Sequence, residues 1–251
     1  MRKPFQGLWN VVRFNWPFYV LALGSVLAAL IFRQYVNELF KLGINVLLLL
    51  AVFLTLASLL VSWYVYDLSG FYKLDWLKGP RPETAETIIN INAGFDDTSE
   101  LLKSKFEGAE VIVFDFYDPA RHTEASIKRA RKAYPPFPGT LSVTTSELPL
   151  DGDSANKIFA IFSAHEIRDA GERDAFFTEI NRALSLHGQL IVVEHLRDAA
   201  NFLAYNIGAF HFHSRASWLG TFAAAGLQIE YEIKLTPFVS AFFLRKHGTS
   251  S

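Results

Sequence analysis

The chain has 251 residues, a formal net charge of −1 at neutral pH and no cysteine. The near-zero charge gives no electrostatic support for nucleic-acid binding, and the lack of cysteine excludes disulfides, zinc–thiolate sites and cysteine nucleophiles. Hydrophobic residues make up 51% of the chain and concentrate toward its N-terminus, so we expect one α/β domain preceded by an apolar appendage.

Two uncharged stretches near the N-terminus predict a transmembrane hairpin over residues 1–66. Residues 14–32 and 42–66 carry no charged side chain, and each is long enough to cross about 30 Å of hydrocarbon as a helix. A signal peptide and a pair of buried core helices are the alternatives. No small-residue cleavage site stands out, and the second stretch is apolar all round rather than striped, which favours the hairpin.

The basic residues that flank the two stretches predict the orientation of the hairpin. More of them lie outside the hairpin than in its connecting turn; the outer ones are Arg2, Lys3, Arg13, Lys73, Lys78 and Arg81. This bias places both termini in the cytoplasm. The apolar hairpin would allow a homodimer, although Gly24 and Ser25 alone are too few small residues to establish one.

The next segment, residues 67–84, mixes aromatic and charged residues and ends in Gly and Pro, which predicts an amphipathic linker at the membrane surface. An alternative interpretation makes Tyr66, Tyr72 and Trp76 part of a lid over an active site.

The remaining residues, 85–251, alternate strand and helix patterns. Apolar runs predict strands at 87–92, 111–116, 141–145, 157–162 and 189–194, followed by a hairpin of 228–235 and 238–244. Helical patterns separate most of these runs. The order predicts an α/β, Rossmann-like, mostly parallel seven-stranded sheet with an antiparallel C-terminal edge hairpin.

An acidic residue ends the second predicted strand. In doubly wound sheets a ligand lies beyond the carboxyl ends of the strands, and an acid about 20 residues after the first loop binds a ribose. Asp115 follows Gly94 by 21 residues. The pattern therefore predicts a nucleoside site, with a solvated helix cap as the plain alternative for Asp115.

Four segments in this order resemble the class I S-adenosylmethionine-dependent methyltransferases, in the type 11 branch that acts on small molecules. They are the strand and loop IINI-NAGF, the acid Asp115, the block SELPLDGDSANKIFAIFSAHEI and the segment RALSLHGQLIVVEH, and the likeness covers about residues 85–245. One departure is that the family's first loop carries several glycines, whereas this chain keeps only Gly94. A catalytically degenerate fold that serves as a binding or partner module is therefore the alternative, and other nucleoside-using α/β enzymes are a third.

The resemblance implies S-adenosylmethionine as the cofactor and assigns its contacts. The first loop would hold the methionine part, Asp115 the ribose, the residues after strands two and three the adenine, and those after strand four the sulfonium. The implied contacts are Asn92, Ala93, Gly94, Phe95, Asp115, Phe116, Thr144, Thr145, Ser146, Ser163 and Ala164. For Thr144–Ser146 an ordinary turn is the alternative.

Polar side chains at the ends of strands four and five are the candidate catalytic groups. Each end offers a histidine beside a carboxylate, so His165 or His195 could remove a proton from the acceptor while Glu166 or Glu194 orients the imidazole. An acceptor pocket is expected around the aromatic stretch 201–213. Its candidate residues are Tyr72, Arg197, Tyr205, Asn206, His211 and His213.

The same aromatic stretch raises the question of a metal. His211, His213 and Glu194 offer suitable ligand types, but the His-x-His spacing alone is weak, so no metal is assigned. An aromatic helix packed on the sheet or the membrane is the alternative for this stretch.

Together these patterns predict a membrane-anchored S-adenosylmethionine-dependent methyltransferase with a small, lipid-soluble acceptor and no nucleic-acid partner. A simpler alternative is that the anchor only keeps the enzyme beside a membrane partner.

Overall fold

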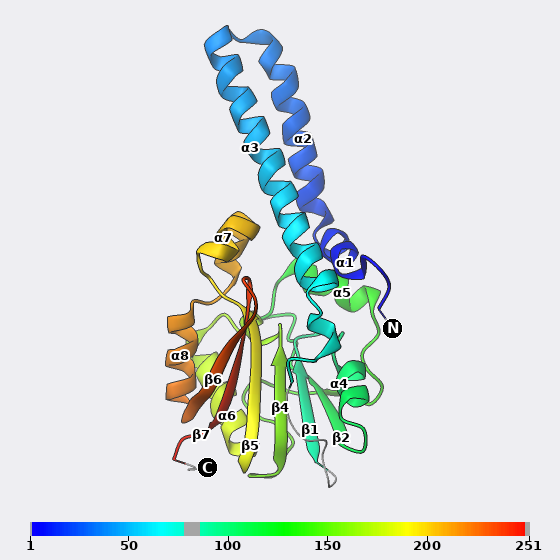
Figure 1. Ribbon diagram of the computed structural model, residues 1–251, viewed down its shortest axis with the longest axis vertical. Coiled ribbons are helices and arrows are strands. Elements are labelled where there is room, and N and C mark those ends of the chain that lie inside the picture. The colour runs from blue at the N-terminus through cyan, green and yellow to red at the C-terminus, as the bar shows by residue number, and fades with distance from the viewer. Residues whose placement is uncertain (1, 78–85, 249–251) are drawn as a thin grey trace.

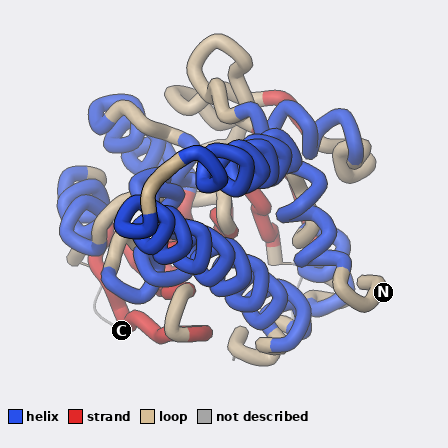
Figure 2. The backbone as a smooth tube through the Cα atoms, turned by 90° about the horizontal axis from the view of Figure 1, so that it is seen from above, coloured by secondary structure: helices blue, strands red, loops and turns tan. Residues whose placement is uncertain are grey.

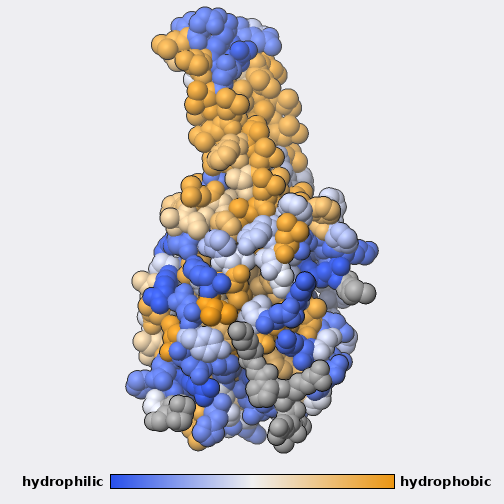
Figure 3. Space-filling view, viewed as in Figure 1, coloured by the Kyte–Doolittle hydropathy of each residue, from blue (hydrophilic) through white to orange (hydrophobic). Residues whose placement is uncertain are grey.

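The computed structural model describes residues 2–77 and 86–248. Its N-terminal part is a helical hairpin that rises above an α/β domain (Figure 1). Helix α1 spans Gln6–Phe14, α2 spans Trp16–Phe32 and α3 spans Glu38–Trp63. The helices α2 and α3 are long and apolar enough to cross a membrane, and no residue of their apolar windows is buried. Figure 3 shows the shaft of the hairpin as a continuous hydrophobic surface with a hydrophilic tip.

The domain contains a seven-stranded sheet with the order β3-β2-β1-β4-β5-β7-β6. The strands are β1 (Thr87–Asn92), β2 (Glu110–Asp115), β3 (Leu141–Ser142), β4 (Ala155–Ile161), β5 (Leu184–His195), β6 (Leu227–Thr236) and β7 (Val239–Lys246). The first five run parallel, whereas β7 pairs antiparallel with both β5 and β6. The predicted fold class is confirmed.

Helices lie around the strands when the molecule is seen from above (Figure 2). They are α4 (Ser99–Lys105), α5 (Ala125–Ala133), α6 (Ala170–Ala183), α7 (Ala199–Tyr205) and α8 (Arg215–Ala224). Phe176, Phe177, Trp218 and Phe222 of α6 and α8 form one apolar core with the sheet.

The segment that follows α3 supplies much of the second core. It continues as a π-helical turn, Tyr64–Leu68, and a 3-10 turn, Phe71–Lys73. Val65, Phe71 and Leu74 are at most 3% exposed and pack with residues of β1, β4, β5 and β7. The hairpin thus runs directly into the domain core. Residues 78–84 of the predicted linker, and with them Lys78 and Arg81 of the orientation argument, lie outside the described residues.

Helix α1, which the sequence did not indicate, docks at the base of the hairpin. The Asp67 carboxylate accepts hydrogen bonds from the backbone N–H groups of Gly7 and Leu8, both 2.9 Å long. An acid at this place satisfies free N–H groups and complements the helix dipole. At the other end, the Tyr134 hydroxyl donates to Asn10 Oδ1 at 2.8 Å. These contacts hold α1 over the β1 and β2 side of the domain.

Candidate active site

The loop after β1 is shaped by one glycine and two capping side chains. Gly94 has φ +93°, a backbone conformation that glycine adopts without steric cost, and its N–H donates to Asn92 Oδ1 at 2.9 Å. Asp96 Oδ1 accepts from the N–H groups of Thr98 and Ser99 at 3.0 and 2.9 Å, which fixes the start of α4. Side chains therefore hold the turn into α4, at the place where the first loop of the resembled family carries several glycines.

Asp115 ends β2 as predicted, and its carboxylate already has partners. Oδ1 accepts the Tyr117 N–H at 2.9 Å, and Oδ2 pairs with the Arg131 guanidinium from α5. The same guanidinium lies 4.6 Å from the centre of the Tyr117 ring. It also lies against the first loop, because a Cβ built on Gly94 would be 2.5 Å from Arg131 Nη1. Arg131 thus fills the space between Gly94 and Asp115.

The way in which Arg131 is held tests whether the residues present suit S-adenosylmethionine. A flat cation here finds a carboxylate acceptor at Asp115, an aromatic face at Tyr117 and a backbone without a side chain at Gly94. Ribose hydroxyls, an adenine ring and the approach of a sulfonium need the same three features. The residues present therefore fit the cofactor once Arg131 turns away. The Arg131 side chain is 40% exposed, so it can turn into solvent.

The other expected cofactor contacts lie at the same edge of the sheet with different exposures. Phe95 packs edge-on against Phe14 and Tyr134, with ring centres 5.5 and 5.4 Å apart, so α1 and α5 roof the loop. Ala93, Ser163 and Ala164 are buried, and the Ser163 hydroxyl donates to the Ile91 carbonyl at 2.8 Å.

The aromatic neighbour of Asp115 differs from the expected one. Phe116 is 1% exposed and packs on Phe176 in the core, whereas Tyr117 faces the site. Thr144 and Ser146 are exposed, and the hydroxyl of buried Thr145 donates to Glu172 Oε1 at 2.6 Å.

His165 and Glu194 form a buried pair where β4 and β5 end. His165 Nδ1 lies 2.7 Å from Glu194 Oε2, and the His165 backbone N–H donates to Oε1 of the same carboxylate at 3.2 Å. His165 Nε2 lies 3.5 Å from Glu166 Oε1. Burial alone would lower the pKa of His165, but the two carboxylates outweigh it and raise the pKa to about 10. At neutral pH this imidazole is therefore a cation and cannot accept a proton.

His195 is held quite differently. Its Nδ1 lies 2.9 Å from the Phe238 carbonyl and its Nε2 lies 2.8 Å from the Tyr66 hydroxyl. The ring is stacked between Phe162 and Phe212, with centres 5.1 and 5.0 Å away. Burial lowers the pKa of His195 to about 4, so the ring is neutral at neutral pH. With Nδ1–H donating to the carbonyl, Nε2 accepts a hydrogen bond from the Tyr66 hydroxyl.

The six expected acceptor-pocket residues do not lie together. Tyr205 packs against His195 with ring centres 5.3 Å apart, and His211 packs against His165 at 5.0 Å. Asn206, with φ +53°, forms the turn between Tyr205 and His211. The remaining three, Tyr72, Arg197 and His213, lie apart: Tyr72 donates to Asp97 at 2.7 Å, Arg197 is exposed, and His213 lies 3.2 Å from the Ile167 carbonyl.

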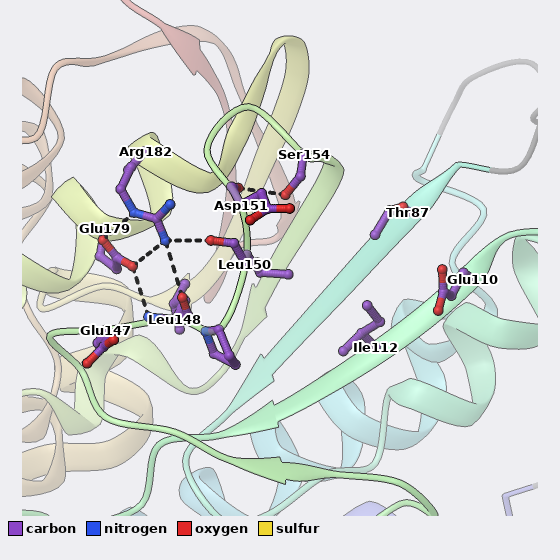
Figure 4. Close-up of a pocket in the computed structure, with 11 residues that line it drawn as sticks. Thr87, Glu110, Ile112, Glu147, Leu148, Leu150, Asp151, Ser154, Glu179 and Arg182 are labelled. Carbon is purple, nitrogen blue, oxygen red and sulfur yellow. Dashed lines mark hydrogen bonds and ion pairs between the residues drawn. The ribbon is translucent and has the colours of Figure 1, made fainter.

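Two cavities lie at opposite edges of the sheet. One of about 440 Å³ lies at the carboxyl edge and is lined by Arg121, His122, Arg168, Asp169 and Glu172. Another of about 660 Å³ opens near the first residues of β1 and β2, Thr87 and Glu110. Figure 4 shows how Arg182 closes its far side through Glu179 and the carbonyls of Leu148 and Leu150. This second cavity is remote from the predicted cofactor loop.

Arg131 and Tyr117 are the site residues that the sequence did not single out. Arg131 lies in the basic helical pattern at 122–134, where nothing local distinguishes it from its basic neighbours. Tyr117 differs from the expected Phe116 by a single position.

No protein-family model matches the sequence, and no curated protein matches it significantly. Solved structures do match the fold. A S-adenosylmethionine-dependent methyltransferase from Aquifex aeolicus superimposes with a TM-score of 0.50 at 15% identity over 72% of this chain and 94% of that chain. A protein from Pyrococcus horikoshii gives 0.51 at 14% identity, over 71% and 90%.

A third match is the complex of a methyltransferase activator and a putative methyltransferase from Haloferax volcanii. It gives a TM-score of 0.50 at 14% identity, over 71% of this chain and 89% of that chain. At these identities the likeness shows the fold alone.

Proposed function

We propose that this protein is a membrane-anchored S-adenosylmethionine-dependent methyltransferase that acts on a small, lipid-soluble acceptor. The observation that carries the proposal is the combination of this sheet order with Asp115 at the end of β2, facing Gly94 of the β1 loop. The coarser part, a methyltransferase, also has the support of the shared fold. The anchor and the acceptor class rest on the hairpin and on the surfaces around its base.

In this proposal the cofactor supplies an electrophilic methyl group on a sulfonium. Asp115 accepts the ribose hydroxyls, Tyr117 offers its ring to the adenine, and the Asn92–Phe95 loop holds the methionine part. Arg131 must release Asp115 first. Because a carboxylate paired with arginine is already neutralised, Arg131 competes with the cofactor and lowers its apparent affinity.

The acceptor needs orientation and, for a hydroxyl or an ammonium group, a base. His195 suits this role because it is neutral and its Nε2 accepts from the Tyr66 hydroxyl. A proton leaving the acceptor would pass to His195 either directly or through Tyr66. The His165–Glu194 pair, with Glu166, contributes fixed charge that orients the acceptor.

The surroundings of the hairpin base support a lipid-soluble acceptor. Leu203, Ile207 and Phe210, in α7 and the turn after it, are 75, 84 and 62% exposed. Exposed apolar side chains of this size mark an interaction surface. They lie beside α3, since α3 and α7 pack together, and Tyr66 joins this region to His195. A bilayer around the hairpin would cover these three exposed side chains. A lipid-soluble acceptor could then reach the acceptor side of the site from the bilayer.

One observation favours a second candidate function, a catalytically degenerate binding module. Arg131 occupies the space between Gly94 and Asp115 and satisfies the acid without a cofactor. In that case the fold would serve to bind a partner at the membrane.

Titration calorimetry separates the two candidates. The full-length protein in detergent is titrated with S-adenosylmethionine and S-adenosylhomocysteine, beside Asp115→Asn and Arg131→Ala. We expect micromolar binding, its loss in Asp115→Asn, and binding at least about tenfold tighter in Arg131→Ala because the competing cation is gone. The matched control is Asp151→Asn, at an exposed acid of the remote cavity, which should bind as the wild type does.

Lack of binding by both the wild type and Arg131→Ala, with the protein shown to be folded by thermal unfolding, would overturn the methyltransferase proposal in favour of the binding module. Binding that survives in Asp115→Asn would instead disprove the assigned cofactor position.

A further inference from the structure

Three side chains converge into one cluster on the acceptor side, and the proposed methyl transfer uses two of them, His165 and Glu166, only as fixed charge. His165 and Glu166 come from the turn after β4, and His211 comes from the turn after α7. One ligand atom of each, an imidazole nitrogen or a carboxylate oxygen, lies within 4.8 Å of the other two. Two imidazoles and one carboxylate are a common donor set for divalent transition metals.

The separations in this cluster suit ligands of one ion better than a hydrogen-bonded network. His165 Nε2 and His211 Nε2 each lie 3.5 Å from Glu166 Oε1, which is longer than an ordinary N–H···O bond. Ligand atoms about 2.1 Å from a tetrahedral zinc ion are roughly 3.4 Å apart. Two of the three separations therefore match a tetrahedral site, and the third, between the two histidines, is at most 4.8 Å.

Each histidine also has a carboxylate on its far nitrogen. His165 Nδ1 lies 2.7 Å from Glu194 Oε2, and His211 Nδ1 lies 3.1 Å from Glu124 Oε1. When an ion displaces the Nε2 proton of His165, the carboxylate that accepts Nδ1–H fixes the ring and makes Nε2 a better ligand. In both histidines Nε2 faces Glu166 Oε1.

Two features of charge bear on the cluster. Glu166 and Glu194 are 3% and 0% exposed, and buried carboxylates need a compensating cation. Arg168 opposes metal binding. Its guanidinium contacts His211 Nδ1, but a metal-bound His211 would carry a proton on this nitrogen and donate it to Glu124. The Arg168 side chain is 41% exposed, so it can turn into solvent.

We propose that His165 Nε2, Glu166 Oε1 and His211 Nε2 bind one divalent transition-metal ion of the Zn²⁺ class, and that Arg168 competes with it. Three protein ligands leave a coordination position for a water or an oxygen donor of a small molecule. A bound ion would take over the fixed charge that His165 and Glu166 supply in the proposed methyl transfer. Ion binding itself needs neither the cofactor nor the acceptor.

Metal binding is measured on the tag-free, full-length protein in detergent, after removal of metal with a chelator and without any cofactor. Zn²⁺ is titrated in competition with a chromophoric chelator, and Co²⁺ is titrated for the absorption bands of a four-coordinate site. We expect one ion per chain. His211→Ala and Glu166→Gln should each weaken Zn²⁺ binding at least about tenfold, whereas Arg168→Ala should tighten it.

The matched control is His187→Ala, which removes an exposed histidine on β5 and should leave the affinity unchanged. His211 and Arg168 are partly exposed, so their variants should fold, and thermal unfolding verifies this. The inference is overturned when neither the wild type nor Arg168→Ala binds an ion stoichiometrically. It is equally overturned when Glu166→Gln and His211→Ala bind Zn²⁺ as tightly as the wild type does. Because no cofactor is present, either result leaves the methyltransferase proposal untouched.

Discussion

His165 and His195 stand at the ends of neighbouring strands, yet their environments make the first a cation and leave the second neutral. Carboxylates surround His165 and raise its pKa to about 10, whereas aromatic rings enclose His195 and lower its pKa to about 4. The sequence presents both as a histidine beside a glutamate. The difference comes from Tyr66 and Phe212, which lie far from His195 in the chain, and local pattern carries no information on such contacts.

His195 should make the protein sensitive to acid. Its folded pKa of about 4 lies below the unfolded value of 6.5, so between these values the unfolded chain binds more protons and stability falls as the pH falls. At pH 5 the loss relative to neutral pH is about 2 kcal/mol. We expect His195→Asn to reduce the drop in melting temperature between pH 7.5 and pH 5, followed by tryptophan fluorescence.

His187→Asn, an exposed histidine on the same strand, should keep the acid sensitivity of the wild type. An unchanged pH dependence in His195→Asn would show that this ring does not remain neutral in the folded protein.

The positions of some predicted site residues follow from the order of the strands along the chain. Asp115 and the Asn92–Phe95 loop lie at neighbouring strand ends because β1 and β2 pair in parallel register. The partner of Asp115 could not be predicted. Arg131 reaches it from α5, and how a helix is oriented against a sheet is not visible in the sequence. His211 was grouped with His213 on spacing alone, but the turn at Asn206 sends it to Glu166 instead.

At the scale of elements, the buried strands were predicted well and the small docking helix was missed. Strand β1 was expected at 87–92 and spans Thr87–Asn92, because a run covered on both faces is continuously apolar. Helix α1 has only nine residues and directly precedes an apolar span. Its position depends on Asp67, some 60 residues later, so no local signal reveals it.

The contact between α1 and the turn after α3 should be intolerant of added bulk. A Cβ at Gly7 would lie 2.3 Å from Tyr66 Cβ, whereas a Cβ at Gly24 would have no atom within 4 Å. We therefore expect Gly7→Ala to destabilise the protein by about 1–3 kcal/mol and Gly24→Ala to have little effect. Thermal unfolding of both variants in one detergent checks this, and equal melting temperatures would show that α1 is not docked as described.

At the scale of the molecule, the hairpin and the domain form one body. Val65, Phe71 and Leu74 carry the end of the hairpin into the sheet's second core, and α1 and α7 pack beside α3. Composition predicted a hairpin and a domain joined by a surface linker. The mixed pattern of residues 67–77 hid their burial, because aromatic side chains in such a segment suit a membrane surface and a protein core equally well.

The proposed anchoring places the region after α7 against lipid. The chain has no cysteine, so single-cysteine variants take one polarity-sensitive dye each. In lipid nanodiscs, dyes at Leu203→Cys and Phe210→Cys should report an apolar environment and be quenched by brominated lipids. Leu186→Cys, which is also exposed but lies near the start of β5, should report water. Dyes at positions 203 and 186 behaving alike would contradict this placement.

The rigid joint at Val65 and Phe71 has a kinetic consequence. Under the proposed function, a catalytic domain that cannot swing away from its anchor would keep its site opening at one fixed height above the bilayer. Under the proposed function, enzyme and acceptor then meet by lateral diffusion in two dimensions. The rate should depend on the mole fraction of acceptor among the lipids, and adding inert lipid at constant bulk concentration should slow turnover by surface dilution.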